Sequence, residues 1–139
     1  MSSRSEDHPG SVRRIGVMIV ADHPIMRDSL RRLLRQQADM DLAGELSAAG
    51  TVSSELARLQ PDVLIIDLQS QHGEAQRAIK AIRSASPLTP IVLLTTYPWE
   101  SEHLYADDPD TVVVLSKTAP GDEVIAVVRQ AALRRKFTL

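Results

Sequence analysis

Two carboxylates, one hydroxyl and one ammonium group each stand directly after a short apolar run of the 139-residue sequence. The acids are Asp22 and Asp67, the hydroxyl belongs to Thr95, and the ammonium group belongs to Lys117. In one cleft, a carboxylate can act as a nucleophile towards phosphorus while the second carboxylate helps to hold Mg²⁺. The hydroxyl and the lysine can bind the oxygens of the transferred group. These residue types therefore indicate phosphoryl chemistry, provided that the fold brings them together.

The apolar runs that precede these residues have the length and composition of buried β-strands. They contain four to six residues, three of the four are rich in β-branched side chains, and none alternates with polar residues. Strands that are covered on both faces have this character. The runs are Ile15–Val20, Val63–Ile66, Ile91–Leu94 and Val112–Leu115, and a weaker run at Asp41–Leu46 predicts an edge strand.

Helical patterns fill the intervals between these strands. Apolar residues recur there at helical spacing, and Pro24 and Pro120 stand where a helix would start, a position that tolerates the missing N–H of proline. The apolar stripes are Met26, Leu30, Leu33 and Leu34; Val52, Leu56 and Leu59; Ala75, Ala78, Ile79 and Ile82; and Val124, Val127, Val128, Ala131 and Ala132.

The alternation of strands and helices predicts an α/β fold with a doubly wound, five-stranded parallel sheet. Because crossovers between parallel strands are right-handed, we expect a flavodoxin-like arrangement with strand order 2-1-3-4-5 and helices on both faces. In such sheets, functional groups gather outside the carboxyl ends of the strands. All four candidate residues follow strands at those ends, so the fold should bring them into one cleft.

Length and composition are those of one globular domain, with 43% hydrophobic and 24% charged residues. The net charge of −2 argues against broad nonspecific binding to nucleic acid, and the absence of cysteine excludes disulfides and cysteine-ligated zinc. No signal peptide or membrane-spanning run is present, which favours a cytoplasmic location. We expect residues 1–13 to form a flexible leader, 14–136 the domain, and 137–139 the start of a linker or a C-terminal tail.

Each candidate residue also has an explanation that involves no chemistry. Asp22 can cap the helix that Pro24 opens, and Asp67 can be a simple loop acid. Thr95 can be an ordinary residue at a strand end, and Lys117 can be a solvated lysine. Their convergence at one edge of the sheet, rather than any single residue, favours the phosphoryl site.

Motifs of other phosphate and hydrolase chemistries are absent from the sequence. It contains no G-x-x-x-x-G-K-S/T loop, no G-x-G-x-x-G loop and no G-x-S-x-G elbow. Asp67 is followed by Leu68 and Gln69, without the second acid two residues on that aspartyl-phosphate phosphatases of the dehalogenase type use. A small phosphatase-like enzyme is therefore a minor alternative, which an assay of phosphate-ester turnover would detect.

Four stretches in this order and spacing carry a resemblance to a known family. They are IVADHPIMRDSLRRLL, PDVLIIDL, IVLLTTY and VLSKTAPGDEVIAVV. Over residues 14–135 the sequence resembles a response-regulator receiver domain of a two-component system, in particular the kind that precedes a LuxR/NarL-type DNA-binding domain. The stretches are similar to the family's first strand and helix, its phosphoacceptor strand, its threonine strand, and its lysine turn with the last helix.

The resemblance implies a role for each residue at a strand end. Asp67 is the expected phosphoacceptor, and Asp22, Asp67 and the backbone carbonyl of Gln69 are the expected Mg²⁺ ligands. Thr95 is the expected switch hydroxyl, and Lys117 the expected phosphate-contacting lysine. The domain should therefore act as a signalling module, not as an enzyme beyond its own phosphorylation and slow dephosphorylation.

The resemblance also implies partners. A histidine kinase would donate the phosphoryl group, and a homodimer would form, for which we favour the first and last helices. DNA would be contacted only through an output domain that this chain does not contain, and no membrane contact is expected. Phosphorylation would regulate transcription through that output domain or through the dimer state.

One departure from the family pattern affects the metal. The family usually has two acids after the first strand, and here the first of them is replaced by Ala21. A unit charge about 4–5 Å from a divalent cation, at nearly aqueous screening, contributes on the order of 2 kcal/mol to the binding of the cation. We therefore expect Mg²⁺ binding that is weaker by roughly thirtyfold but not abolished.

Other departures affect the loops and the output face. The loop after Asp67 is about two residues shorter than usual, without the Met-Pro pair and without a later acid. Val114 stands where the family usually has an aromatic residue that moves with the switch threonine. The segment after Thr95 predicts a fourth helix that is short or disordered, because it holds Pro98, Pro109, Asp107, Asp108 and Asp110.

These departures support an alternative to phosphorylation. The chain could be an atypical receiver that serves as a constitutive dimerisation module, or one that binds a small ligand or a partner in the same cleft. Ala21, the short loop and Val114 favour this alternative, whereas the presence of Asp22 and Asp67 opposes it. Thr95 and Lys117 oppose it as well.

Overall fold

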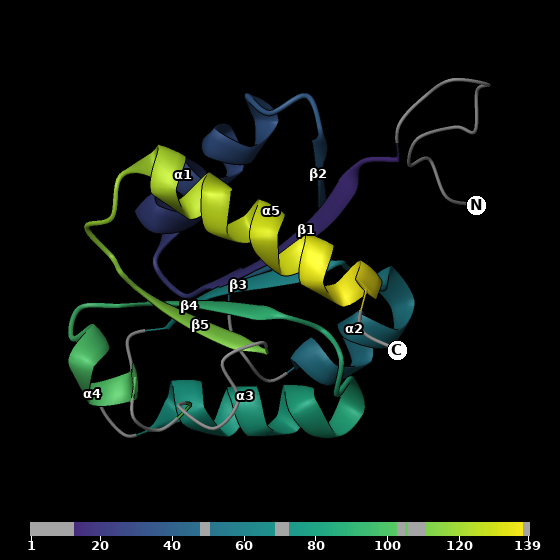
Figure 1. The fold of residues 1–139 in the computed structure, drawn as a ribbon. Coiled ribbons are helices and arrows are strands. Elements are labelled where there is room, and N and C mark those ends of the chain that lie inside the picture. The colour runs from purple at the N-terminus through teal and green to yellow at the C-terminus, as the bar shows by residue number, and fades with distance from the viewer. Residues whose placement is uncertain (1–12, 48–50, 69–72, 103–104, 106–110, 138–139) are drawn as a thin grey trace.

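The structure is a computed structural model that describes residues 13–47, 51–68, 73–102, 105 and 111–137 (Figure 1). Five parallel strands form one sheet in the order β2-β1-β3-β4-β5, and this confirms the predicted flavodoxin-like topology. The strands are β1 (Ile15–Ala21), β2 (Met40–Leu46), β3 (Val63–Asp67), β4 (Ile91–Thr95) and β5 (Val112–Ser116). The helices are α1 (Pro24–Arg35), α2 (Val52–Leu59), α3 (Glu74–Ala85), α4 (Pro98–Glu102) and α5 (Gly121–Phe137).

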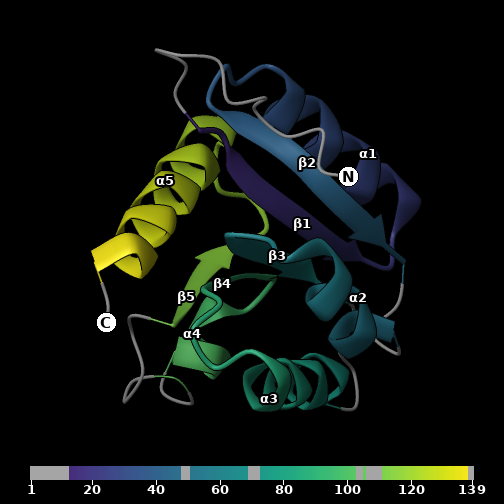
Figure 2. The same ribbon diagram turned by 90° about the vertical axis from the view of Figure 1, so that its right-hand side faces the viewer.

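Helices cover both faces of the sheet. In Figures 1 and 2, α1 and α5 lie on one face, whereas α2 and α3 lie on the other. The central strand β1 divides its side chains between these layers, because successive side chains of a strand point to opposite faces. Val17 and Ile19 belong to one core cluster with Val128 of α5, while Met18 belongs to the second cluster with Ile79 of α3. All five side chains are fully buried or nearly so.

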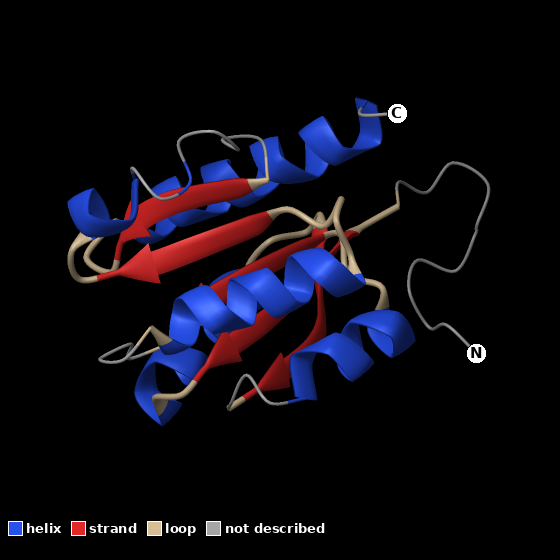
Figure 3. Ribbon diagram, turned by 90° about the horizontal axis from the view of Figure 1, so that it is seen from below, coloured by secondary structure: helices blue, strands red, loops and turns tan. Residues whose placement is uncertain are grey.

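The apolar stripes of the sequence are the inner faces of the helices. The α3 stripe is buried throughout, with Ile82 inaccessible to solvent. Leu30 and Leu34 of α1 are buried, and Met26 and Leu33 pack against the same core cluster with part of their surface exposed. Figure 3 shows the sheet between the two helical layers that these stripes hold in place.

Prolines and one glycine mark the helix starts, as the sequence predicts for Pro24, which is the first residue of α1. The carbonyl of Pro120 accepts the N–H of Val124 at 3.1 Å and so opens the first turn of α5. Gly73 precedes α3 with a φ of 73°, a left-handed conformation that glycine adopts without steric cost.

The fourth helix is short, as predicted. It spans five residues, whereas α3 spans twelve. The acids Asp107, Asp108 and Asp110, which the sequence places after it, lie outside the described residues. Among the residues that are described, no helix is long and apolar enough to cross a membrane.

Candidate functional site

The residues that the sequence predicts for the site lie at the ends of four strands: Asp67 and Thr95 end β3 and β4, and Asp22 and Lys117 directly follow β1 and β5. In the ladder between β1 and β3, Ala21 is opposite Asp67, and the Asp22 N–H donates to the Asp67 carbonyl at 3.3 Å. In the ladder between β4 and β5, Thr95 is opposite Ser116, and the N–H of Lys117 donates to the Thr95 carbonyl at 2.9 Å. Because β3 and β4 are neighbours in the sheet, all these ends meet at one edge.

The Asp67 carboxylate and the Lys117 ammonium group form an ion pair. Lys117 Nζ lies 2.7 Å from Asp67 Oδ1. The carboxylate is 2% exposed and the lysine side chain is 21% exposed, so the pair is largely removed from water. The second oxygen, Oδ2, is buried and makes no hydrogen bond within the described part of the chain. One oxygen of Asp67 is therefore held by the protein, and the other retains its lone pairs for a ligand or a reaction.

Two opposing influences set the pKa of Asp67. Burial raises the pKa above the ordinary value of a carboxyl group, and the negative charge of Asp22 adds to the shift. The hydrogen bond and the positive charge of Lys117 oppose it, as does the charge of His23 to a smaller extent. The pKa of Asp67 is raised overall, because removing the carboxylate from water costs more free energy than the ion pair with one partly exposed lysine contributes.

Asp22 lies beside this pair at the end of β1 and is half-buried. The sequence also allows Asp22 to help cap α1. The N-cap position belongs to His23, whose side chain makes no capping hydrogen bond. The negative charge of Asp22 also helps to raise the pKa of Asp67 across the ends of β1 and β3.

A contact between Arg27 and the backbone of Ala21 is a part of the site that the sequence did not predict. The Ala21 side chain is fully buried among apolar residues of the α1 and α5 layer. Its carbonyl accepts a hydrogen bond from Arg27 Nη1 at 2.8 Å. Arg27 also lies 3.8 Å from Glu45 Oε1 at the end of β2. The peptide between Ala21 and Asp22 is therefore held on both sides, by Arg27 at its C=O and by Asp67 at its N–H.

Two carboxylates are suited to hold a divalent cation here. Asp22 and Asp67 supply oxygen ligands of the kind that Mg²⁺ prefers, and Asp67 Oδ2 is a buried oxygen that lacks a hydrogen bond in the described region. Within that region, no group of three or more His, Cys, Asp or Glu side chains is gathered for a metal. The residues thus fit a site with one acid fewer than the family pattern, and Gln69, the third expected ligand, lies outside the described residues.

Thr95 connects the site to two aromatic side chains. Its hydroxyl accepts the N–H of Tyr97 at 3.3 Å. The rings of Tyr97 and Trp99 meet edge to face at 5.4 Å, and both are largely exposed at 53% and 64%. A cavity of about 350 Å³ lies against Thr95, Tyr97 and Lys117. Val114, the residue that replaces an aromatic side chain, is half-buried on β5 and packs against the core cluster of the α2 and α3 layer.

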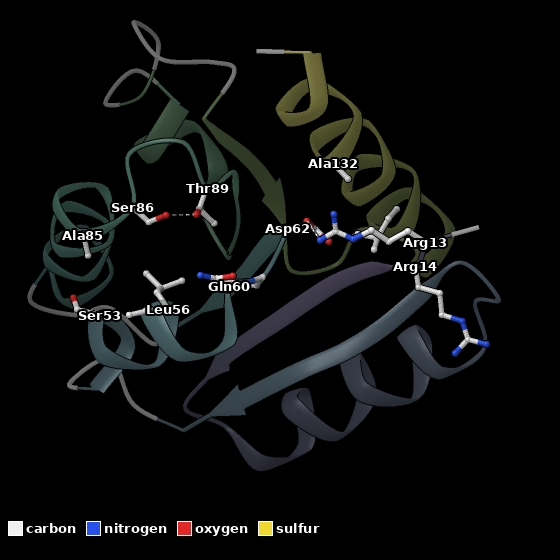
Figure 4. A pocket seen from close by; sticks show the side chains of 13 residues that line it. Arg13, Arg14, Ser53, Leu56, Gln60, Asp62, Ala85, Ser86, Thr89 and Ala132 are labelled. Carbon is white, nitrogen blue, oxygen red and sulfur yellow. Dashed lines mark hydrogen bonds and ion pairs between the residues drawn. The ribbon is translucent and has the colours of Figure 1, made fainter. Parts of the chain in front are cut away.

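A different cavity, of about 590 Å³, lies among the amino ends of the strands, far in the fold from these carboxyl ends (Figure 4). Several of its polar side chains take part in hydrogen bonds or ion pairs. The hydroxyls of Ser86 and Thr89 share a hydrogen bond, and Asp62 accepts the N–H of Gly16 at 2.8 Å and pairs with Arg13 at 3.6 Å. None of the four residues that the sequence predicts for phosphoryl chemistry lines this cavity.

Comparison with known proteins decides the family. The family model "Response regulator receiver domain" matches residues 17–129. The chain belongs to the response-regulator receiver family. Receiver domains generally bind Mg²⁺ at their acidic site.

This receiver domain is similar in sequence to bacterial proteins that are named as regulatory proteins. It is 31% identical to the uncharacterized transcriptional regulatory protein YxjL of Bacillus subtilis, over 86% of this chain and 55% of YxjL. It is 28% identical to the oxygen regulatory protein NreC of Staphylococcus haemolyticus, over 81% of this chain and 52% of NreC. The receiver chain thus spans about half the length of these relatives.

A solved structure agrees with the fold. The receiver domain superposes on a LuxR-family two-component response regulator from Aurantimonas with a TM-score of 0.75 and 22% identity, over 86% of each chain. This likeness supports the architecture of the domain.

Proposed function

We propose that Asp67 accepts a phosphoryl group from the phosphohistidine of a histidine kinase in the presence of Mg²⁺. One observation carries the proposal: a buried carboxylate is paired with a lysine at 2.7 Å through Oδ1, while Oδ2 makes no hydrogen bond in the described region. A purely structural ion pair has no use for a buried oxygen without a partner, because such an atom costs free energy.

The phosphoryl group is transferred in one displacement step. Asp67 Oδ2 attacks phosphorus, an O–P bond forms, and the N–P bond of the phosphohistidine breaks. The electron pair of that bond passes to the imidazole nitrogen, which takes up a proton from water. Lys117 then faces the new phosphoryl oxygens, so that a cation is already placed where negative charge increases.

Asp22 and Asp67 would hold the metal, with the Gln69 carbonyl as a further expected ligand. Bound there, Mg²⁺ would neutralise part of the negative charge of the incoming phosphoryl group. Since Ala21 contributes no third carboxylate, we expect the weak binding that the sequence predicts. Asp67 is only 2% exposed, so the donor reaches it after a local movement around the carboxylate.

The signal would leave through Thr95. In the described state, its hydroxyl accepts the N–H of Tyr97. If that hydroxyl turns to a phosphoryl oxygen on Asp67, Tyr97 loses its acceptor and the exposed Tyr97–Trp99 pair is free to shift. Phosphorylation would in this way bias a two-state equilibrium at the surface.

The partners follow from the family. We propose a cytoplasmic regulator in which this domain controls a DNA-binding output domain or a homodimer through α1 and α5. YxjL, which is named as a transcriptional regulatory protein and of which the matched region covers only 55%, supports an output of this kind. The only chemistry that we assign to the domain is its own phosphorylation and slow dephosphorylation.

Beryllofluoride, which mimics an acyl phosphate, tests the proposal without a kinase. We expect ¹⁹F NMR to show a bound species only when Mg²⁺ is present, and to show none with Asp67→Asn. Asp122→Asn, which changes an exposed acid in the first turn of α5, is the matched control and should bind like the wild type. Binding that survives Asp67→Asn, or none with the wild type at high Mg²⁺, would contradict the proposal.

A second candidate function is that of a phosphorylation-independent receiver, which acts as a dimerisation or ligand-binding module. It is favoured by the buried Ala21 in place of an acid and by the cavity of about 350 Å³ beside Thr95 and Lys117. Sedimentation velocity separates the two functions. A dimer that is present without phosphoryl donor and unchanged by it supports the second candidate.

A further inference from the structure

The chain turns sharply directly after β5. The N–H of Ala119 donates to the Ser116 carbonyl at 3.0 Å, so residues 116–119 form a closed turn with Lys117 and Thr118 at its centre. The N–H of Lys117 is bound to the Thr95 carbonyl on the neighbouring strand. The lysine therefore starts from a backbone position that is fixed on the side of β4.

The Ser116 side chain fixes the other side of the lysine. Its Oγ accepts the N–H of Thr118 at 3.1 Å and forms a hydrogen bond of 2.8 Å with the Thr118 hydroxyl. Serine favours this arrangement, because its hydroxyl can bind the backbone two residues on and so stabilise a turn. Ser116 thus clamps the turn from the residue before Lys117 to the residue after it.

We propose that Ser116 is a positioning residue for Lys117, and that its hydroxyl holds the turn from which the lysine reaches Asp67. The reason lies in the length of the lysine side chain, whose four carbons give it many rotamers. Lys117 Nζ lies 2.7 Å from Asp67 Oδ1 when the backbone of the turn is fixed. A turn with more conformational freedom would allow the ammonium group to occupy a larger volume and would weaken this contact. The consequence for phosphorylation rests on the proposed function, whereas the consequence for the lysine itself does not.

Comparison of variants at position 116 tests this role. Ser116→Ala removes the hydroxyl, and Ser116→Thr keeps it on a residue suited to a strand end. Ser29→Ala, at an exposed position of α1, is the matched control. We expect Ser116→Ala to lower the N–H order parameter of the Lys117 ammonium group and to unprotect the Thr118 amide in hydrogen exchange, while Ser116→Thr and Ser29→Ala resemble the wild type.

Phosphorylation by a small-molecule donor gives the functional readout. The rate constant should fall about three- to tenfold in Ser116→Ala, as expected for the loss of one hydrogen bond. In the background of Lys117→Gln, the same change at Ser116 should have no effect, because Ser116 acts through the lysine. A merely structural role would lower the rate equally in both backgrounds.

The outcomes distinguish the two proposals. An unchanged Lys117 order parameter in folded Ser116→Ala, or an equal loss of rate in the Lys117→Gln background, would overturn the role of Ser116. If the wild type takes no phosphate but Ser116→Ala loosens Lys117, the role of Ser116 stands and the phosphoacceptor function falls. If Ser116→Ala unfolds, Thr118→Val, which removes only the partner hydroxyl, should still loosen the lysine, and a rigid lysine in that variant would overturn the role.

Discussion

Lys117 Nζ, in the residue directly after β5, lies 2.7 Å from Asp67 Oδ1 at the end of β3. The proposed phosphoacceptor is thus paired with a lysine, and the side chains of Asp67 and Lys117 are only 2% and 21% exposed. This pairing offsets part of the cost of burying the carboxylate, yet the pKa of Asp67 is still raised. The site is therefore built around a carboxylate that the fold does not fully stabilise, as is common where a group serves chemistry.

Replacement of the buried carboxylate should stabilise the protein at neutral pH. We expect Asp67→Asn to increase the free energy of unfolding by about 1 kcal/mol, because the amide has no charge to bury and the partly exposed lysine can turn towards water. The folded pKa of Asp67 lies above its ordinary value of 3.8, so the carboxyl group stays protonated to a higher pH in the folded state than in the unfolded state.

The pH dependence of that gain follows from the sign of the shift. Below pH 3.8, both states are protonated and the wild type carries no charge penalty. As pH rises from there through the folded pKa, the wild type loses stability that Asp67→Asn keeps. Urea denaturation at several pH values measures the difference in the free energy of unfolding between Asp67→Asn and the wild type. A difference that becomes smaller towards neutral pH would contradict the raised pKa of Asp67.

Removal of the lysine should have the opposite effect. Lys117→Met leaves the Asp67 carboxylate buried without its cation, so its pKa should rise further and the protein should lose about 2 kcal/mol at neutral pH. The loss is below that of a fully buried pair, because Lys117 is 21% exposed. The loss of stability should become smaller as pH falls through the folded pKa of Asp67. Thermal unfolding of Lys117→Met and the wild type at several pH values measures this loss. Lys117→Arg, which keeps the charge, should lose less.

Return of the missing acid should strengthen the metal site. We expect Ala21→Asp to lower the Kd for Mg²⁺ by roughly thirtyfold, since it adds one carboxylate near the cation. Because Ala21 is fully buried among apolar side chains, the metal-free variant should lose about 2 kcal/mol of stability. Trp99 fluorescence reports Mg²⁺ binding, and Ala81→Asp, at an exposed position of α3, is the matched control. Equal Kd values for the wild type and Ala21→Asp would refute this reading of Ala21.

The hydroxyl of Thr95 should matter for the response more than for the chemistry. Thr95→Val removes the acceptor of the Tyr97 N–H, whereas Thr95→Ser keeps it. We expect both variants to take up phosphate, but only Thr95→Ser to show a phosphorylation-dependent change in Trp99 fluorescence. The same change in Thr95→Val would show that the aromatic pair does not depend on this hydroxyl.

Much of the fold could be predicted from the sequence, because its strands and helices differ in period. Buried strands such as β3 read as unbroken apolar runs, and the inner faces of α1 and α3 repeat at helical spacing. The position of Asp67, Thr95 and Lys117 at one edge then follows from the rule that parallel strands end together. The short α4 could be predicted from the prolines and acids of its segment.

Contacts that depend on side-chain direction could not be predicted. Arg27 lies among the polar residues of α1 and reads as part of a solvated helix face, yet its guanidinium binds the Ala21 carbonyl. The sequence indicates only that Ser116 lies at the end of a strand, whereas its hydroxyl accepts the N–H of Thr118 and so stabilises the turn that contains Lys117. Both contacts join a side chain to a backbone group, and no periodic pattern of residue types encodes them. The expected ligand Gln69 stays a prediction, since it lies outside the described residues.

Intact-mass measurement tests the central claim most directly. The wild type and Asp67→Asn are incubated with Mg²⁺ and a small-molecule phosphoryl donor, with a parallel series over Mg²⁺ concentration. We predict the addition of one phosphate to the wild type at high Mg²⁺ and none to Asp67→Asn. A wild type that gains no mass at any Mg²⁺ concentration, or an Asp67→Asn variant that gains the same mass, would contradict Asp67 as the phosphoacceptor.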